Sequence, residues 1–185
     1  MKRLVVAAVA AGALALGLCA PASATFYEWI YYSRNGSLIN GSLNYNCSIS
    51  TCSSAIWRAG SGSGTTACEK NNWIPLGSYD VPFHDDNYVA TKIQGRVWRL
   101  TDYQCSNGVV RTELFIHSEE TSSNGQSCPT GGDDPFCWEG TNDYYSAGCI
   151  KIARKPVTNG QSDLGRLDSW DHGSAGKIDW VNVSS

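Results

Sequence analysis

Cys149 and His117 are residues of this sequence whose types could together perform nucleophilic chemistry. Cys149 lies in the segment SAGCIK at 146–151, and His117 lies 32 positions earlier. A cysteine attacks through its thiolate, and its ordinary pKa of about 8.5 leaves little thiolate at neutral pH unless a base or a positive charge is near. A histidine within hydrogen-bond reach can take the proton or form a thiolate–imidazolium pair. We therefore expect a reactive thiol at Cys149, which alkylates faster than a model thiol near neutral pH.

Gly148, directly before Cys149, fits the same chemistry. A glycine permits a tight backbone and lets a substrate carbonyl approach closely. The backbone N–H groups of Gly148 and Cys149 could then form an oxyanion hole. A purely structural explanation stands beside this one. A cysteine at the start of a strand is often a small core residue or half of a disulfide, and a single histidine after an apolar strand is often structural.

The cysteine count bears on which thiol is unpaired. Cys19 falls in an expected signal peptide, and its removal leaves seven cysteines, so an oxidised monomer keeps at least one thiol. Proximity in polar loops favours the pairs Cys47–Cys52 and Cys128–Cys137, and Cys68–Cys105 is then a plausible third pair. This assignment leaves Cys149 unpaired, although six cysteines allow 15 pairings.

The N-terminus has the pattern of a signal peptide. Lys2 and Arg3 precede an apolar run, and Ala22-Ser23-Ala24 forms an A-x-A cleavage site. We expect residues 1–24 to be removed and residues 25–185 to form one domain, without a membrane anchor, that is secreted or associated with the cell wall. The remaining chain has 12 basic and 17 acidic residues, which argues against a nucleic-acid partner. We expect a monomer.

The pattern of the remaining chain predicts a mainly β fold. Short runs rich in Val, Ile, Tyr and Trp alternate with Gly, Ser, Asn and Thr. We predict one helix at 162–170, exposed loops at 60–64 and 119–142, and strands at 26–32, 42–45, 54–59, 77–81, 96–103, 109–117, 149–153 and 177–183.

Two of these strands must position the thiol and the imidazole. Successive side chains of a strand point to opposite faces of the sheet. Ile150 and Ile152 would enter the core, which turns Cys149 the other way. In the strand at 109–117, His117 falls on the less apolar face. If the two strands are neighbours, the imidazole and the thiol could meet.

The segment IHS at 116–118, followed by SAGCIK at 146–151, resembles the signature of the L,D-transpeptidase catalytic domain. Upstream, WIPLGSY at 73–79 is similar to the Pro-x-Gly segment of that family. The resemblance implies a β-sandwich-like, disulfide-braced domain with at most one or two short helices, acting on peptidoglycan stem peptides. In that family the cysteine attacks the amide before the terminal D-amino acid of a stem tetrapeptide. The resulting thioester is resolved by an amine, which gives cross-linking or exchange, or by water, which gives carboxypeptidation.

The resemblance also implies a set of site residues, all from the two motifs. They are Cys149 as nucleophile, His117 as general base, Gly148 with Cys149 as backbone oxyanion donors, Ser146 as the motif's hydroxyl residue, Lys151 as a residue that orients the loop or meets a substrate carboxylate, and Ser118 as a second substrate-binding residue. Two positions depart from the family. Its second histidine is Ala147 here, and the spacing between the motifs is longer than usual. We interpret the extra residues, which include Cys128 and Cys137, as a disulfide-braced lid or specificity loop.

Two other classes of function have some support in the sequence. His84-Asp85-Asp86, His117 with Glu119 and Glu120, and Asp171-His172 contain metal-ligand types, but no H-E-x-x-H or paired-cysteine zinc spacing occurs. We therefore expect no metal and no cofactor in catalysis. Seven tryptophans and nine tyrosines would suit a non-catalytic cell-wall or glycan-binding module, although most aromatic side chains of a small β domain lie in its core.

Overall fold

The computed structural model describes residues 26–48, 54–129, 134–154, 162–173 and 177–185. The expected signal peptide at 1–24 and Cys52 lie outside these ranges. Within them the chain is mainly β, as predicted, with one α-helix, α1 (Asp163–Gly173), and one short 3-10 helix, η1 (Thr141–Tyr144). The strands are β1 (Glu28–Ser33), β2 (Gly41–Cys47), β3 (Ala55–Ser61), β4 (Gly77–Asp80), β5 (Phe83–Val89), β6 (Gln94–Arg99), β7 (Tyr103–Gln104), β8 (Val110–Arg111), β9 (Phe115–His117), β10 (Ile150–Ile152) and β11 (Ile178–Ser184).

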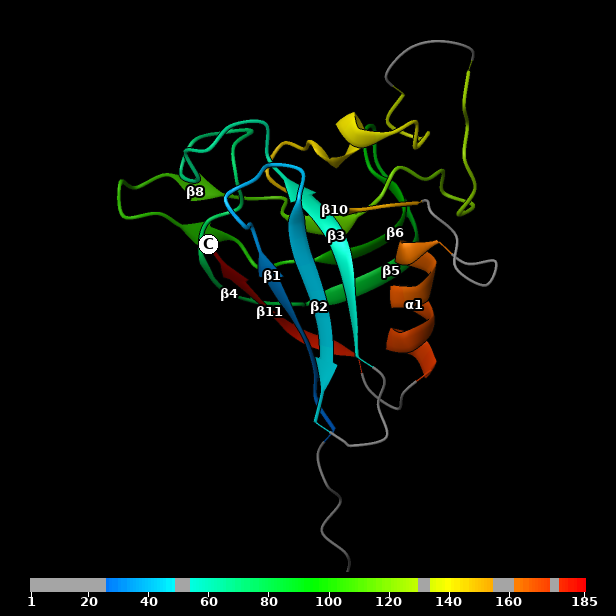
Figure 1. Cartoon of the computed structure of the whole chain (residues 1–185), viewed down its shortest axis with the longest axis horizontal. Helices are drawn as coiled ribbons and strands as arrows, with labels where there is room; N and C mark the ends of the chain where they lie inside the picture. Colours follow the sequence, from blue (N-terminus) through cyan, green and yellow to red (C-terminus); the bar gives the residue numbers. More distant parts are fainter. Residues whose placement is uncertain (1–25, 49–53, 130–133, 155–161, 174–176) are drawn as a thin grey trace, which may run out of the picture.

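Nine strands form a single curled sheet in the order β4-β11-β1-β2-β3-β10-β9-β6-β5. The pairs β1–β11 and β9–β10 are parallel, and the other pairs in this sheet are antiparallel. In Figure 1 the curl carries β5 and β6 across behind β2 and β3, with α1 beside them. β7 and β8 form a separate two-stranded hairpin. The layers expected of a sandwich-like domain are therefore supplied by one sheet that folds back on itself.

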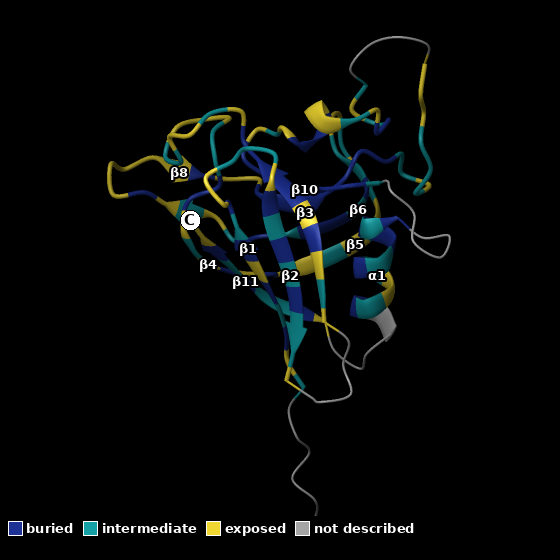
Figure 2. Cartoon of the chain, in the orientation of Figure 1, coloured by how far each residue is buried: buried dark blue, intermediate teal, exposed yellow. Residues whose placement is uncertain are grey.

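The inner face of the curled sheet carries the main core. Apolar side chains from most strands meet two leucines of α1 there. Figure 2 shows buried positions alternating with half-buried ones along β2, as expected of a strand with one face in the core. The buried members include Ile30, Leu43, Trp57, Trp98, Ile116, Ile150, Ile152, Leu164, Leu167 and Val181. Because alternate residues of a strand face opposite ways, Ile116 and Ile150 on this face turn their neighbours Phe115, His117 and Cys149 outward.

The prediction of one strand at 109–117 is wrong. The segment is divided into β8 and β9, and Glu113 between them has a φ of 55°. A left-handed residue cannot continue an extended strand, so the chain changes direction there. β8 pairs with β7, whereas β9 enters the main sheet between β10 and β6. This break brings the backbone of Glu113 next to Cys149.

Two other differences from the predicted elements arise from packing between distant segments. β5 falls outside the predicted strands, since its polar sequence FHDDNYV alternates between half-buried and exposed positions instead of carrying an apolar face. The prediction of an exposed loop at 60–64 is wrong at its start, because β3 continues through Ser61 and residues 60–62 are buried. Those buried positions support the turn before Cys149.

The predicted disulfide brace is present. Cys68 is bonded to Cys105 and Cys128 to Cys137. Cys47 is also disulfide-bonded. Cys149 is the free cysteine of the described residues, and it is buried. Disulfides of this kind are typical of an oxidising compartment. Among the described residues no helix is long and apolar enough to span a membrane.

Candidate active site

Cys149 immediately precedes β10, on the outer face of the sheet. Ile150 pairs with Ser61 of β3 on one side and with Ile116 of the parallel strand β9 on the other. The side chain of Cys149 packs in a small outer cluster with Val97 and Phe115. The predicted strand alternation is therefore confirmed, and the two motif strands are neighbours in the sheet.

His117 lies on the same outer face as Cys149 but further along the strands. Its register partner is Lys151, whereas Cys149 lies beside Phe115. The imidazole Nδ1 donates to the Ser118 carbonyl oxygen at 2.9 Å, and the thiol donates to the Glu113 carbonyl oxygen at 3.5 Å. Within the described part of the chain no hydrogen bond joins the two side chains. The sheet thus brings the thiol and the imidazole onto one surface, offset by two register positions along the strands.

Burial determines the charge of both groups. It lowers the pKa of His117 from 6.5 to about 3, with a smaller contribution from the positive charge of Lys151. It raises the pKa of the Cys149 thiol from 9.0 to about 11, against the opposing effects of the Phe115 backbone, Lys151, Arg99 and Arg111. The resting pair is consequently a neutral thiol and a neutral imidazole, not a thiolate–imidazolium pair. This reverses the expectation of fast labelling at neutral pH.

Alkylation of native, unreduced protein should therefore be slow at neutral pH and should accelerate as the pH rises toward about 11. A pKa raised by two units reduces the thiolate fraction at neutral pH about 100-fold relative to an ordinary thiol. The measurement is the rate of iodoacetamide labelling between pH 6 and 11, with peptide mapping to Cys149. The same protein unfolded in urea is the control and should label at the ordinary rate. Equal rates for native and unfolded protein at pH 7.5 would contradict this environment for the thiol.

Ser146 holds the turn that leads into Cys149. Its Oγ donates to the Cys149 carbonyl oxygen at 2.7 Å and accepts from the N–H groups of Gly62 at 2.8 Å and Gly148 at 3.1 Å. The hydroxyl therefore positions the nucleophile. Because the Gly148 N–H is already engaged by Ser146, the expected role of Gly148 as an oxyanion donor does not match this arrangement.

Gly148 is required for its backbone conformation and its lack of a side chain. Its φ is +113°, and a Cβ at this position would collide with Arg111 Nη2 and lie 3.1 Å from the Asn72 carbonyl oxygen. The Arg111 guanidinium donates to the backbone carbonyl oxygens of Ala67, Trp73, Asn72 and Ala147. It thereby ties the loop at 67–73 to the turn before Cys149.

Gly148→Ala should therefore impair both stability and the placement of the thiol. The positive φ alone costs a non-glycine residue about 1–3 kcal/mol, and the displaced Arg111 releases the loop at 67–73. Gly108→Ala is a matched control, because Gly108 has a φ of +84° but a Cβ added there would meet nothing within 4 Å. Urea unfolding should show a loss of stability in both variants. Alkylation of Cys149 should be altered in Gly148→Ala and unchanged in Gly108→Ala. Identical behaviour of the two variants would refute the steric role of Gly148.

Lys151 and Ser118, which were expected to bind substrate, are both buried. Lys151 is only 7% exposed, and its Nζ is paired with the Glu119 carboxylate. This pairing corrects the expectation that Lys151 meets a substrate carboxylate, and it favours the alternative in which Lys151 orients the chain beyond His117. Ser118 is 2% exposed, and its carbonyl oxygen accepts from His117. The Ser118 backbone therefore holds the imidazole, and the Lys151–Glu119 pair fixes the chain that follows it.

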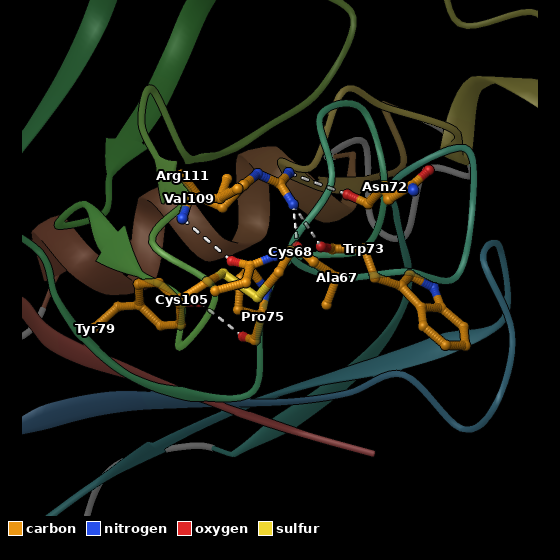
Figure 3. The surroundings of a disulfide bond; sticks show 10 residues. Ala67, Cys68, Asn72, Trp73, Pro75, Tyr79, Cys105, Val109 and Arg111 are labelled. Atoms are coloured by element: carbon orange, nitrogen blue, oxygen red, sulfur yellow. Dashed lines mark hydrogen bonds between the residues drawn. A yellow bond between two sulfur atoms is a disulfide. The ribbon is translucent and has the colours of Figure 1, made fainter.

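A pocket of about 630 Å³ opens over Cys149. Its walls come from the loop around Asn71, the β5–β6 turn, the break between β8 and β9, and Ala147. The disulfide Cys68–Cys105 braces one wall, because it ties the loop at 67–73 to the β7–β8 hairpin. Figure 3 shows this disulfide below the Arg111 side chain. The Cys105 N–H donates to the Val109 carbonyl oxygen at 2.8 Å, which adds a second tie within the hairpin.

Comparison with protein-family models, curated proteins and solved structures gave no match. The function of the chain must therefore be inferred from the geometry of this site.

Four charged residues of the pocket are absent from the set predicted from the sequence. Lys70, Lys92 and Arg111 contribute positive charge, and Glu113 contributes negative charge. They come from three separate segments, so no motif spacing connects them all. One sequence feature could have pointed to two of them. The expected pairing of Cys68 with Cys105 implies that the segments carrying Lys70 and Arg111 lie close together.

Proposed function

We propose that this protein is an exported cysteine acyltransferase of the L,D-transpeptidase type that acts on peptidoglycan stem peptides. The observation that carries the proposal is the position of Cys149. It is a free thiol that lines a pocket, on the same sheet face as a neutral histidine from the adjacent parallel strand. The motif resemblance supplies the substrate class, and the disulfides agree with a secreted or cell-wall location.

The chemistry begins with transfer of the thiol proton. Since His117 Nδ1 donates to Ser118, the second ring nitrogen, Nε2, carries the lone pair that accepts this proton. The sulfur attacks the amide carbonyl carbon before the terminal D-amino acid. When the C–N bond breaks, His117 returns the proton to the departing amine, and Cys149 holds the acyl group as a thioester.

Because the two side chains are offset along the strands, the thiol and the imidazole must approach each other before the proton can be transferred. Proton transfer needs a heavy-atom distance of about 2.6–3.2 Å or one bridging water, and catalytic contacts often tighten only when substrate is bound. In the second half-reaction His117 takes a proton from an acceptor amine or from water, which attacks the thioester carbonyl. When the C–S bond breaks, His117 returns the proton to the Cys149 sulfur. An amine acceptor gives cross-linking or exchange, and water gives carboxypeptidation.

The charge of the pocket suits a peptide that ends in a carboxylate. Lys70 and Lys92 are exposed at the pocket, and the Arg111 guanidinium lies deeper, bonded to backbone carbonyl oxygens. Glu113, also exposed at the pocket, offers a complementary site for an amine. A stem peptide contains both groups, so the lining favours such a substrate over a neutral one.

A non-catalytic glycan-binding module is the second candidate. Trp29 and Trp180 stack at 5.5 Å with an interplanar angle of 4°, and Tyr27 lies 5.9 Å from Trp180. Flat aromatic groups of this kind can support a sugar ring. In this alternative, binding to peptidoglycan would persist without Cys149 and no peptide bond would change.

The test is incubation with purified disaccharide tetrapeptides and a labelled D-amino acid, followed by mass spectrometry. The proposal expects a tripeptide product, an exchanged tetrapeptide, or both. The matched control substrate has an L-amino acid at its terminus and should remain intact. Unchanged substrate, together with saturable binding to peptidoglycan, would favour the glycan-binding module instead.

A further inference from the structure

A second cluster of chemically competent side chains lies between β5 and α1. His84 and Asp86 come from β5, and Asp168 and Asp171 come from α1. His84 Nε2 lies 3.1 Å from Asp86 Oδ1 and 3.5 Å from Asp168 Oδ1, and one ligand atom from each of these three residues lies within 4.8 Å of the other two. A tetrahedral zinc site with metal–ligand distances of about 2.0–2.1 Å separates neighbouring ligands by about 3.3 Å. The donor spacing therefore matches a metal site.

Asp171 fixes the orientation of the imidazole in this cluster. Its Oδ2 lies 3.0 Å from His84 Nδ1 and accepts from Trp98 Nε1 at 3.0 Å, while its Oδ1 accepts from the Ile178 N–H at 2.7 Å. The His84 ring is also stacked on Trp98 at 4.4 Å. A carboxylate that holds one ring nitrogen while the other faces the metal is the usual outer support of a metal-binding histidine. Nε2 is thereby directed at Asp86 and Asp168.

The cluster and its neighbours carry an excess of negative charge. Asp86, Asp168, Asp171 and Glu120 are four carboxylates. Two arginines pair with members of this group. Arg96 pairs with Glu120 and lies 3.3 Å from Asp168, and Arg154 lies 2.9 Å from Glu120. Counted among these six groups, two negative charges remain. A divalent cation bound by the cluster would offset this excess.

We propose that His84 Nε2, Asp86 and Asp168 bind a divalent transition-metal cation of the zinc class. A mixed imidazole and carboxylate donor set suits zinc, cobalt or nickel, whereas calcium and magnesium prefer oxygen ligands alone. The cation would join the edge strand β5 to α1 on the inner face of the sheet, the face opposite Cys149. Its binding free energy would add to the stability of the fold. This proposal does not depend on the acyltransferase function.

Zinc and cobalt titrations of the full exported chain, after treatment with a chelator, test the proposal. Calorimetry should show one zinc ion per chain and a raised Tm, and cobalt should produce the visible absorption of a tetrahedral complex. Asp168→Asn and Asp86→Asn should each weaken zinc binding at least ~10-fold, the lower end of the effect of removing a partner at such sites. Asp102→Asn, which changes a carboxylate paired with Arg99 elsewhere, is the matched control and should bind normally.

Asp86 is the safer variant for folding, because its side chain is 39% exposed whereas that of Asp168 is 21% exposed. Circular dichroism of each metal-free variant verifies the fold. Tryptophan fluorescence gives an independent readout, because Trp98 is stacked on His84. Bound cobalt should quench the tryptophan fluorescence of the wild type more than that of Trp98→Phe. Absence of saturable binding, or equal affinity in Asp86→Asn and Asp102→Asn, would overturn the proposal.

Discussion

Cys149→Ala is expected to abolish conversion of stem tetrapeptides, with a fall in rate of at least ~1000-fold, because the acyl group then has no nucleophile to receive it. His117→Gln should reduce the rate by about 100- to 10,000-fold, the usual contribution of a general base. The measurement is product formation under single-turnover conditions, with wild type and variants at equal concentration. Neither change should prevent folding, since the replacements are small or similar in volume.

Cys149→Ser is the matched control for this pair. It keeps the size and hydrogen-bonding capacity of the side chain but has a far weaker nucleophile, so it should bind tetrapeptide like the wild type while failing to convert it. A Cys149→Ala variant that retained wild-type turnover would refute the assignment. If His117→Gln were as active as the wild type, the assignment of His117 as general base would be refuted, and the assignment of Cys149 as nucleophile would stand.

Removal of the Cys68–Cys105 disulfide should have the largest effect on stability among the changes considered. The bonded cysteines are 37 positions apart, and the loop-closure model gives about 4 kcal/mol for a cross-link of that span. The double variant Cys68→Ser with Cys105→Ser should therefore show a much lower free energy of unfolding in urea. It should also lose turnover at temperatures where it remains folded, because the loop at 67–73 forms a wall of the pocket over Cys149.

The Cys128–Cys137 disulfide provides the matched control. Its cysteines are nine positions apart, for which the same relation gives about 2.6 kcal/mol. Neither cysteine lines the pocket over Cys149. The corresponding double serine variant should be destabilised less and should keep the thiol reactivity of the folded protein. Equal loss of turnover in both double variants would show that the Cys68–Cys105 disulfide has no special relation to the pocket.

The sequence was sufficient to predict the parts of the site that depend on local pattern. Ile150 and Ile152 alternate with Cys149, so the outward direction of the thiol follows from strand periodicity. The odd cysteine count and the close spacing of Cys128 and Cys137 lead to the correct pairing and to a free Cys149. None of these features requires knowledge of how distant segments pack.

Features that depend on long-range packing could not be predicted in this way. Glu113 lies within an apparently continuous apolar strand, yet its left-handed backbone breaks that strand and creates a pocket wall. Lys151 is expected from the sequence to orient the loop or to meet a substrate carboxylate, whereas it forms a buried ion pair with Glu119. A charged residue becomes buried only when a partner arrives from another segment, and spacing along the chain does not reveal that partner.

The reactivity of Cys149 shows the same limit. The residue type and a nearby histidine lead to an expectation of a fast-reacting thiol, whereas the degree of burial determines the pKa and raises it to about 11. Burial also keeps His117 neutral, with a pKa of about 3. The imidazole therefore has a free lone pair throughout the neutral range but is a weak base in the resting protein, so activation of the thiol must accompany substrate binding.

The most direct test is intact-mass measurement of the protein, quenched in acid shortly after mixing with excess tetrapeptide. The proposed chemistry predicts a covalent adduct whose mass equals the substrate minus its terminal D-amino acid. The adduct should map to Cys149, be released by hydroxylamine as expected of a thioester, and be absent in Cys149→Ala. Product formation without an adduct on Cys149, at the same rate in Cys149→Ala, would contradict the proposed mechanism.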